Sequence, residues 1–155
     1  TINPGGPNHE ELVSLLGIFE YLMNLYQYHF EENQKSILFK IAKINELISK
    51  HEEEIANPIL KFISEKESFN LIGKNKITNK NRAPTISFTN NKISSKQLSD
   101  FLISKKIATR NDNFYAWRCL NALGINTEDG VVRISLAHYN KKKEIYKLIE
   151  ALDSI

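Results

Sequence analysis

The stretch Gly130-Val131-Val132-Arg133-Ile134-Ser135-Leu136-Ala137-His138-Tyr139-Asn140 carries the clearest structural signal in the chain. Its residues alternate in polarity, and a period of two is typical of a strand that is buried on one face. The apolar side carries Val132, Ile134 and Leu136, and the other side carries Val131, Arg133 and Ser135. The pattern therefore predicts a half-buried strand with a single guanidinium on its open side, followed by a helix.

The residue of interest in this strand is Arg133. A guanidinium presents a planar fork of N–H groups, which matches a carboxylate in two parallel hydrogen bonds. Arg133 on a rigid strand is thus a candidate for binding a carboxylate. The strand pattern alone leaves a second interpretation open, in which Arg133 points to solvent or pairs with a nearby Asp or Glu.

Composition narrows the class of protein. The chain has 155 residues, of which 41% are apolar and 25% are charged, as expected for one globular domain with a real core. A net charge of +3 is too small to indicate nucleic acid as the main partner. Cys119 is the single cysteine, so no internal disulfide can form and a reducing cytoplasm is the expected compartment. No apolar run is long enough to predict a membrane span.

The first helix is predicted to follow a loop of prolines and glycines over residues 1–8, with Asn8 as its N-cap. Its apolar residues recur at helical spacing from Leu12 to Tyr26. Further apolar residues, Val13, Ile18 and Leu25, widen this surface beyond one stripe. Two explanations stay open: the helix has a second partner, or its own domain wraps around it.

A second helical pattern runs from about residue 34 to residue 66, and Pro58 lies inside it. Proline removes a backbone donor and clashes with the preceding turn, so the sequence predicts a break or kink near Ala56–Asn57. The charge run over residues 51–54 is typical of a solvated helical face, although it also resembles a metal-binding cluster.

The remaining elements are short. Ser94 and Gln97 form a capping-box pattern that opens a third helix, and Gly124 closes the fourth. The basic segment over residues 74–82 is predicted to be a mobile hairpin loop, because no aromatic residues interleave to stack on nucleic-acid bases. The predicted strands are 69–73, 83–89, 107–110 and the one around Arg133. The later helices are one that begins at Ser94 and buries Leu98, Phe101 and Leu102, one from about 114 to 123, and one N-capped by Asn140. This order predicts an α+β fold in which helices cover a small, mostly antiparallel sheet after a long N-terminal helix.

Motifs of several enzyme classes are missing from the sequence. It has no phosphate-binding glycine loop, no His-Glu-x-x-His and no Gly-x-Ser-x-Gly elbow, and its four histidines lack metal-ligand spacing. Cys119 lies in a short apolar helix, where a cysteine is more often an inert core residue than a nucleophile. The residues alone therefore show no complete catalytic constellation.

Four segments, in a fixed order, resemble the C-terminal part of the class V aminotransferases, and within them the cysteine desulfurase-like proteins. They are Asn3–Glu10, Arg82–Phe88, Ile107–Ala116 and Val131–Asn140. The resemblance implies the small domain of a pyridoxal-phosphate enzyme of the aspartate aminotransferase fold type. The segment Asn113-Phe114-Tyr115-Ala116 resembles a subgroup that lacks the sulfur-accepting cysteine, which would stand at Tyr115.

The resemblance also implies roles for particular residues. Arg133 would bind the carboxylate of a small amino-acid substrate, and the loop with Arg110, Asn113 and Tyr115 would form a wall of the substrate site. The loop with Gly6 and Asn8 would hold the phosphate of the cofactor in a neighbouring subunit. The family has a threonine where Gly6 stands, so backbone amides would do that work here.

The lysine that forms the Schiff base in this family lies upstream of Gly5, in a large cofactor-binding domain. We therefore expect this chain alone to bind no pyridoxal phosphate and to work with that large domain, as a homodimer and without nucleic acid or membrane. Residues 1–32 would be the loop and linking helix from the large-domain side, and residues 33–155 the C-terminal small domain. The alternative is a free-standing, catalytically inactive module that uses the same fold for dimerisation.

Overall fold

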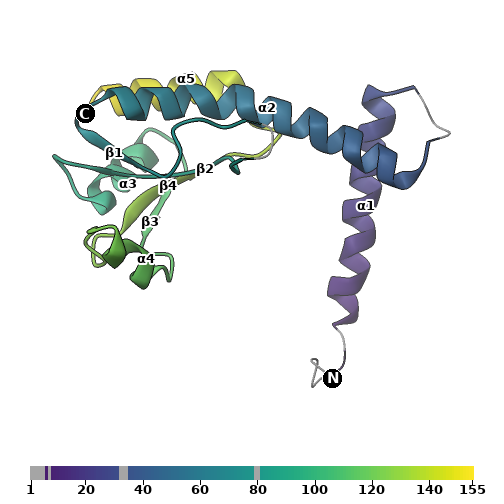
Figure 1. The fold of residues 1–155 in the computed structure, drawn as a ribbon, viewed down its shortest axis with the longest axis horizontal. Coiled ribbons are helices and arrows are strands. Elements are labelled where there is room, and N and C mark those ends of the chain that lie inside the picture. The colour runs from purple at the N-terminus through teal and green to yellow at the C-terminus, as the bar shows by residue number, and fades with distance from the viewer. Residues whose placement is uncertain (1–5, 7, 32–34, 79–80) are drawn as a thin grey trace. The chain divides into compact units, whose positions relative to one another are not determined.

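The computed structural model describes the chain except for residues 1–5, 7, 32–34 and 79–80. Its elements follow the order helix, helix, strand, strand, helix, strand, helix, strand, helix, which confirms the predicted α+β layout (Figure 1). The elements are α1 (His9–His29), α2 (Ile37–Glu65), β1 (Phe69–Ile72), β2 (Thr85–Asn90), α3 (Ser95–Ser104), β3 (Arg110–Asp112), α4 (Trp117–Ala122), β4 (Val131–Ser135) and α5 (Lys142–Asp153). The chain divides into two compact units, residues 1–48 and 49–155.

The first unit holds α1 and the beginning of α2. The carboxamide oxygen of Asn8 accepts a hydrogen bond from the Glu11 N–H at 3.1 Å, which confirms the predicted N-cap of α1. The buried side chains described in this unit are Tyr26 and Ile44. The Lys40 ammonium lies 5.4 Å from the centre of the Tyr26 ring, so a cation–π contact joins α2 to the end of α1.

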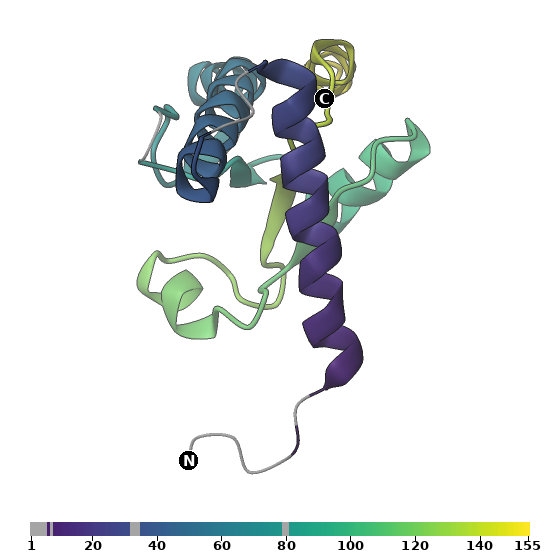
Figure 2. The same cartoon turned by 90° about the vertical axis from the view of Figure 1, so that its right-hand side faces the viewer.

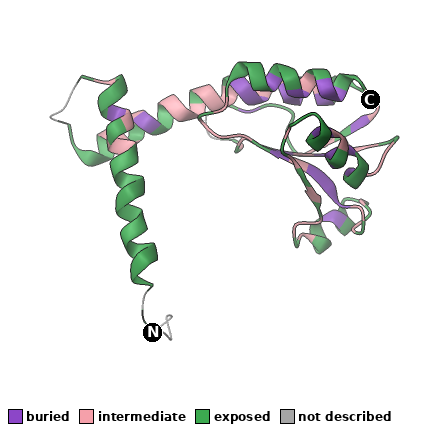
Figure 3. Ribbon diagram, turned by 180° about the vertical axis from the view of Figure 1, so that it is seen from behind, coloured by how far each residue is buried: buried purple, intermediate pink, exposed green. Residues whose placement is uncertain are grey.

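The first half of α1 exposes most of its apolar side chains. Figure 3 shows this helix almost entirely in the colour of exposed residues, and Figure 2 shows its full length. The exposed apolar side chains of this half are Leu12, Val13, Leu15, Leu16, Ile18 and Phe19. We call these six residues the α1 apolar face. Exposed apolar side chains in this number on one helix are typical of an interaction site.

Of the break or kink predicted near Ala56–Asn57, the break is wrong, because α2 continues through Pro58 to Glu65. Proline costs a helix one hydrogen bond, to the carbonyl of the residue four positions earlier, which here is Glu54 on the exposed side. The residues on both sides of Pro58 are fully buried, namely Ile55, Ala56, Ile59 and Leu60. Burial of these side chains outweighs the lost bond and keeps the helix continuous.

The second unit is built on a four-stranded sheet with the order β1-β2-β4-β3. All three neighbouring pairs are antiparallel, in agreement with the predicted sheet. Buried side chains from α2, α3 and α5 form one core with Phe88, Val132 and Ile134 of the sheet. In Figure 1, α2 and α5 lie side by side along one side of the sheet. We call the face that joins this core the covered face, and the opposite one the open face.

Two predicted boundaries near β3 are wrong. The strand expected over 107–110 is β3 at Arg110–Asp112, because the Ile107 N–H still bonds the Leu102 carbonyl at the end of α3. The helix expected over 114–123 is α4 at Trp117–Ala122, because Phe114 and Tyr115 have positive φ values. The capping box of Ser94 and Gln97 is confirmed.

Candidate functional site

The alternation expected for β4 is confirmed from Val132 to Ser135, whereas Val131, expected on the open side, is buried. Val132 is fully buried and Ile134 is nearly so, and both belong to the core cluster on the covered face. Arg133 between them must project from the open face, because successive side chains of a strand point to opposite sides. Its side chain is half-buried and not enclosed in the core. The sheet thus presents the predicted guanidinium on its open side.

The strand registers place Arg133 in a row that crosses the whole sheet. Ile72 of β1 pairs with Ser87 of β2, Ser87 pairs with Arg133, and Arg133 pairs with Arg110 of β3. Residues directly opposite one another in antiparallel strands project from the same face, with Cβ atoms about 5 Å apart. Ser87, Arg133 and Arg110 therefore share the open face, and we call them the arginine row.

The two guanidinium groups of this row have no acidic partner within the described residues. The ion pairs found there join lysines to Asp or Glu and involve neither Arg133 nor Arg110. Like charges directly opposite on a sheet are destabilising. The interpretation of Arg133 as one half of an internal ion pair is therefore not supported for this part of the chain. The open face thus carries two arginines at paired positions for which the described residues provide no carboxylate partner.

The side chain that does contact Arg133 is Phe114. The Cζ atom of Arg133 lies 4.0 Å from the centre of the Phe114 ring, a distance typical of a guanidinium stacked on an aromatic face. Phe114 precedes Tyr115, which is 98% exposed. The loop after β3 therefore turns one aromatic ring onto the arginine row and the next into solvent.

Asn113 holds this loop from within. Its carboxamide oxygen accepts a hydrogen bond from the Tyr115 N–H at 3.0 Å, and its carboxamide nitrogen donates to the Thr127 carbonyl at 3.4 Å. The Ala116 N–H donates to the Asn113 carbonyl at 2.9 Å. In the described structure Asn113 thus supports the shape of the loop that carries Phe114 and Tyr115.

The start of β4 braces the same loop from the other side. Gly130 has a φ of +66°, and a Cβ atom there would overlap the Asp112 carbonyl. The Asp129 carboxylate accepts hydrogen bonds from the N–H of Ser95 at 2.9 Å and from its hydroxyl at 3.1 Å. Asp129 therefore anchors this bend to the first turn of α3, where negative charge is favourable.

The loop that follows β4 is fixed by a second set of bonds. The ring Nε2 of His51 lies 2.9 Å from the Asn140 carbonyl, and the Asn140 carboxamide oxygen accepts from the Ala137 N–H at 2.7 Å. The Glu144 carboxylate accepts from the Lys141 N–H, which lowers the pKa of Glu144, with a smaller contribution from the Asn140 side chain. The helix cap is therefore Lys141, one residue beyond the predicted Asn140.

The residues predicted to hold a cofactor lie before α1. Gly6 and Asn8 are both exposed, and the Asn8 carboxamide oxygen is already engaged as the N-cap of α1. What Gly6 and Asn8 themselves offer a phosphate is their backbone N–H groups and the carboxamide nitrogen of Asn8. The described residues contain no cluster of three or more His, Cys, Asp or Glu side chains that could hold a metal ion.

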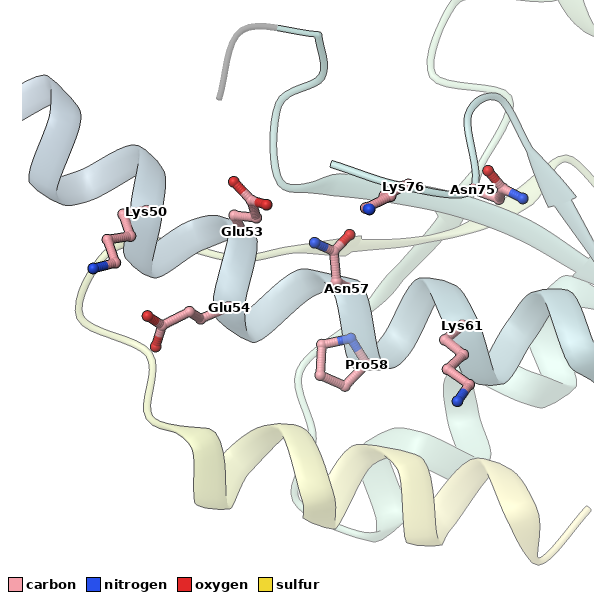
Figure 4. A pocket seen from close by; sticks show the side chains of 8 residues that line it. All are labelled: Lys50, Glu53, Glu54, Asn57, Pro58, Lys61, Asn75 and Lys76. Atoms are coloured by element: carbon pink, nitrogen blue, oxygen red, sulfur yellow. The ribbon is translucent and has the colours of Figure 1, made fainter. Parts of the chain in front are cut away.

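A separate groove of about 840 Å³ lies along α2, beside the segment that follows β1 (Figure 4). Two of its polar groups have internal partners: the Asn57 carboxamide bonds both the N–H and the carbonyl of Ile77, and Glu54 pairs with Lys142 at 3.0 Å. The hydrogen bond from Lys142 also lowers the pKa of Glu54. The groove borders the helix that packs on the covered face, so it does not include the arginine row.

The basic segment 74–82 offers fewer free cations than its sequence suggests. Arg82 donates hydrogen bonds to the carbonyls of Lys74 and Thr85, and burial lowers its pKa. Ile77 is buried and joined to Asn57. The segment is thus anchored to α2, and one of its cations is used internally.

The prediction that Cys119 is a core residue is wrong, because its side chain is exposed on α4. Leu120 fills the buried position of that short helix instead. Among the helices of the described residues, none is both long enough and apolar enough to span a bilayer.

The sequence model of the family described as Aminotransferase class-V matches residues 5–148. The chain belongs to the class V aminotransferase family. It is 28% identical over 128 residues to the aminotransferase-like protein FGM3 of Gibberella zeae, a match that covers 82% of this chain and 30% of that protein.

Solved structures agree on the fold of this class V aminotransferase chain. It is similar to the cysteine desulfurase CsdA of Escherichia coli, with a TM-score of 0.67 and 19% identity, over 97% of this chain and 31% of that one. A cysteine desulfurase of Thermococcus onnurineus NA1 gives a TM-score of 0.62 and 21% identity, over 76% of this chain and 29% of that one. The chain thus spans about a third of the length of these relatives.

The sequence indicated Arg133 but not its contacts. The pairing with Arg110 was missed because the preceding strand was expected to end at Arg110, whereas β3 begins there. The stacking of Phe114 was missed because positive φ values at two consecutive non-glycine residues have no sequence signal. Asn113 before them is the one local hint, since asparagine supports such turns.

Proposed function

We propose that this chain supplies the carboxylate-binding face of a pyridoxal-phosphate enzyme of the class V aminotransferase family. The observation that carries the proposal is the arginine row, in which Arg133 and Arg110 lie opposite one another without an acidic partner in the described residues. The planar N–H fork of a guanidinium binds a carboxylate in two hydrogen bonds. A small amino acid, whose carboxylate is its fixed anionic group, is the substrate class that fits.

Each residue has a part in this proposal. Arg133 on β4 would bind the carboxylate and fix its orientation, because the strand is hydrogen-bonded on both sides. Arg110 would add a second positive charge at the exposed edge. Tyr115 would form the wall of the site that faces solvent in the described structure. Asn113 would keep that wall in place through its bonds to Thr127 and Tyr115.

Pyridoxal phosphate, when bound, supplies the electron sink for bond cleavage at an amino acid. This chain would contribute backbone N–H groups near Gly6 and Asn8 to the cofactor phosphate. Its arginine row would orient the substrate. The remaining contacts to the cofactor would come from a large domain of the same protein.

Tyr115 bears on the kind of reaction. The resemblance places the sulfur-accepting cysteine of a desulfurase at this position, and a phenol cannot take up sulfur as a thiolate does. We therefore propose chemistry on an amino acid that does not pass sulfur to this loop. Cys119 lies four residues further on, exposed on α4, and we do not propose it as a substitute.

The α1 apolar face supports the proposed partners. Six apolar side chains are exposed along one half of a single helix. Burying them against a large domain or a second subunit would remove a large apolar area from water, which is the main driving force for such association. The same face favours the second candidate function, a catalytically inactive module that dimerises through α1.

The test of the proposal is ligand binding by the natural-length protein that contains this chain. The probes are L-alanine, which carries a carboxylate, and L-alaninamide, which does not. We expect Arg133→Ala to weaken the binding of L-alanine about ten- to a hundredfold in calorimetry and to leave L-alaninamide unchanged, as for loss of a charge-assisted hydrogen-bond pair.

Arg118→Ala is the matched control, because Arg118 is an exposed arginine on α4 outside the arginine row. It should bind both probes like the wild type. Equal affinity of the wild type and Arg133→Ala for L-alanine would remove Arg133 from the site. A natural-length protein that contains no large domain and forms dimers through α1 would favour the inactive module.

A further inference from the structure

We propose that Phe114 is a positioning residue for Arg133: its ring holds one face of the guanidinium so that the N–H edge is presented to a carboxylate. This inference rests on the proposed carboxylate-binding function of Arg133. The contact that carries it is the 4.0 Å distance between the Arg133 Cζ atom and the centre of the Phe114 ring.

The geometry of the contact leaves the useful part of the guanidinium free. Its N–H donors lie at the edge of a plane, and its two faces are poorly hydrated. At 4.0 Å the ring covers one of these faces. The arginine side-chain hydrogen bonds found among the described residues are those of Arg82, and none involves Arg133. Stacking therefore leaves the N–H edge available for two parallel bonds to a carboxylate.

The contact also restricts a flexible side chain. A free arginine has several rotatable bonds, and fixing them on binding opposes affinity. A ring that already holds the guanidinium in place reduces this cost before the ligand arrives, which is the usual benefit of preorganisation. The ring also excludes water from one side of the charge, which strengthens its attraction to an anion.

The backbone of the loop indicates that Phe114 is held in this position. Phe114 has a φ of +51° and Tyr115 a φ of +60°, both in the left-handed region that side chains other than glycine seldom adopt. Each such residue costs about 1 kcal/mol or more. Two neighbouring examples persist because Asn113 bonds the Tyr115 N–H and Gly130 allows close approach to Asp112. Strain of this kind, enforced by surrounding bonds, is concentrated at functional sites.

The chain offers an internal comparison for the aromatic ring. Phe62 is also covered by a cation, with the Lys66 ammonium 5.5 Å from its ring centre. Lys66, however, pairs with Asp153, whereas Arg133 has no acidic partner in the described part of the chain. Stacking at Phe114 thus involves a cation whose charge is still available for a ligand.

The experiment uses the natural-length protein with L-alanine and L-alaninamide as probes. Phe114→Ala removes the ring, Phe114→Leu keeps an apolar side chain without a π face, and Phe114→Tyr keeps the π face. We expect Phe114→Ala and Phe114→Leu to weaken L-alanine binding about three- to thirtyfold. Phe114→Tyr should bind like the wild type, and L-alaninamide should bind equally to all four proteins.

Tyr146→Ala, at an exposed aromatic residue of α5, is the matched control and should change neither affinity. Wild-type affinity for L-alanine in Phe114→Leu would overturn the inference, because packing alone would then suffice. Equal losses for both probes in Phe114→Ala and Phe114→Tyr would also overturn it, since they indicate a structural role. Loss of binding in Arg133→Ala with none in Phe114→Ala would refute this inference alone. Unchanged binding in Arg133→Ala would refute the proposed function as well.

Discussion

The two faces of the sheet differ although they are made by the same strands. On the covered face, Phe88 and Val132 are fully buried among side chains of three helices. On the open face, one residue along each strand, Ser87 pairs with Arg133, and Arg133 pairs with Arg110. A shift of one residue thus separates a face that gives stability from a face that carries two arginines without an acidic partner among the described residues. The core on the covered face holds the fold, so the side chains of the open face can serve a ligand.

The sharpest test of this division compares adjacent residues of β2. Phe88→Ala should lower the free energy of unfolding by about 3–5 kcal/mol, because it leaves a cavity in the core. Ser87→Ala, on the open face, should change it by less than about 0.5 kcal/mol. Urea unfolding followed by circular dichroism measures both. Similar losses of unfolding free energy in the two variants would show that side chains of the open face are also packed in a core.

A smaller loss of stability is expected at Gly130, where the start of β4 contacts the loop that follows β3. Gly130→Ala should cost about 1–2 kcal/mol for a positive φ, and more because the new Cβ atom meets the Asp112 carbonyl. The matched control is Gly124→Ala, which has a φ of +70° with no atom near the new Cβ. The difference in urea midpoint between the two variants isolates the close approach. Equal urea midpoints for the two variants would mean that the Asp112 backbone can move away from the new Cβ atom at no cost.

Removing a charge from the arginine row should stabilise the protein, whereas Phe88→Ala and Gly130→Ala should destabilise it. Arg110→Ala should raise the free energy of unfolding by about 0.2–1 kcal/mol at low salt, because it relieves repulsion from Arg133 across the strands. The gain should shrink as salt is added, since exposed charges are screened. Urea titrations at two salt concentrations measure it. Destabilisation by this variant would reveal a partner of Arg110 that offsets its charge.

The smallest expected effect concerns pH and lies outside the sheet. The folded-state pKa of Glu144 is below its ordinary value of 4.5, because the carboxylate accepts the Lys141 N–H. Its stabilising contribution is therefore present above that ordinary value and is lost as the pH falls through the lower, folded-state pKa. Wild type should lose more stability than Glu144→Gln between about pH 5 and pH 3. Glu150→Gln, an exposed position of the same helix, should behave like the wild type.

Much of this architecture could be predicted from local patterns. The order of the elements, the cap at Asn8, the capping box at Ser94 and the alternation around Arg133 all follow from periodicity and short-range hydrogen bonding. Errors arose where packing overrode a local rule, as at Pro58 within α2. They also arose where a strand began later than its composition indicated, as at Arg110.

The sequence by itself determined that Arg133 lies on the polar side of a strand, because side chains alternate along any strand regardless of its neighbours. Only the tertiary structure decided that Arg110 lies opposite it and that Phe114 stacks on it. Register depends on pairing between distant segments, and the left-handed loop depends on bonds from Asn113 and space at Gly130. Neither is encoded in a local pattern, since both arise from contacts made only when the sheet is assembled.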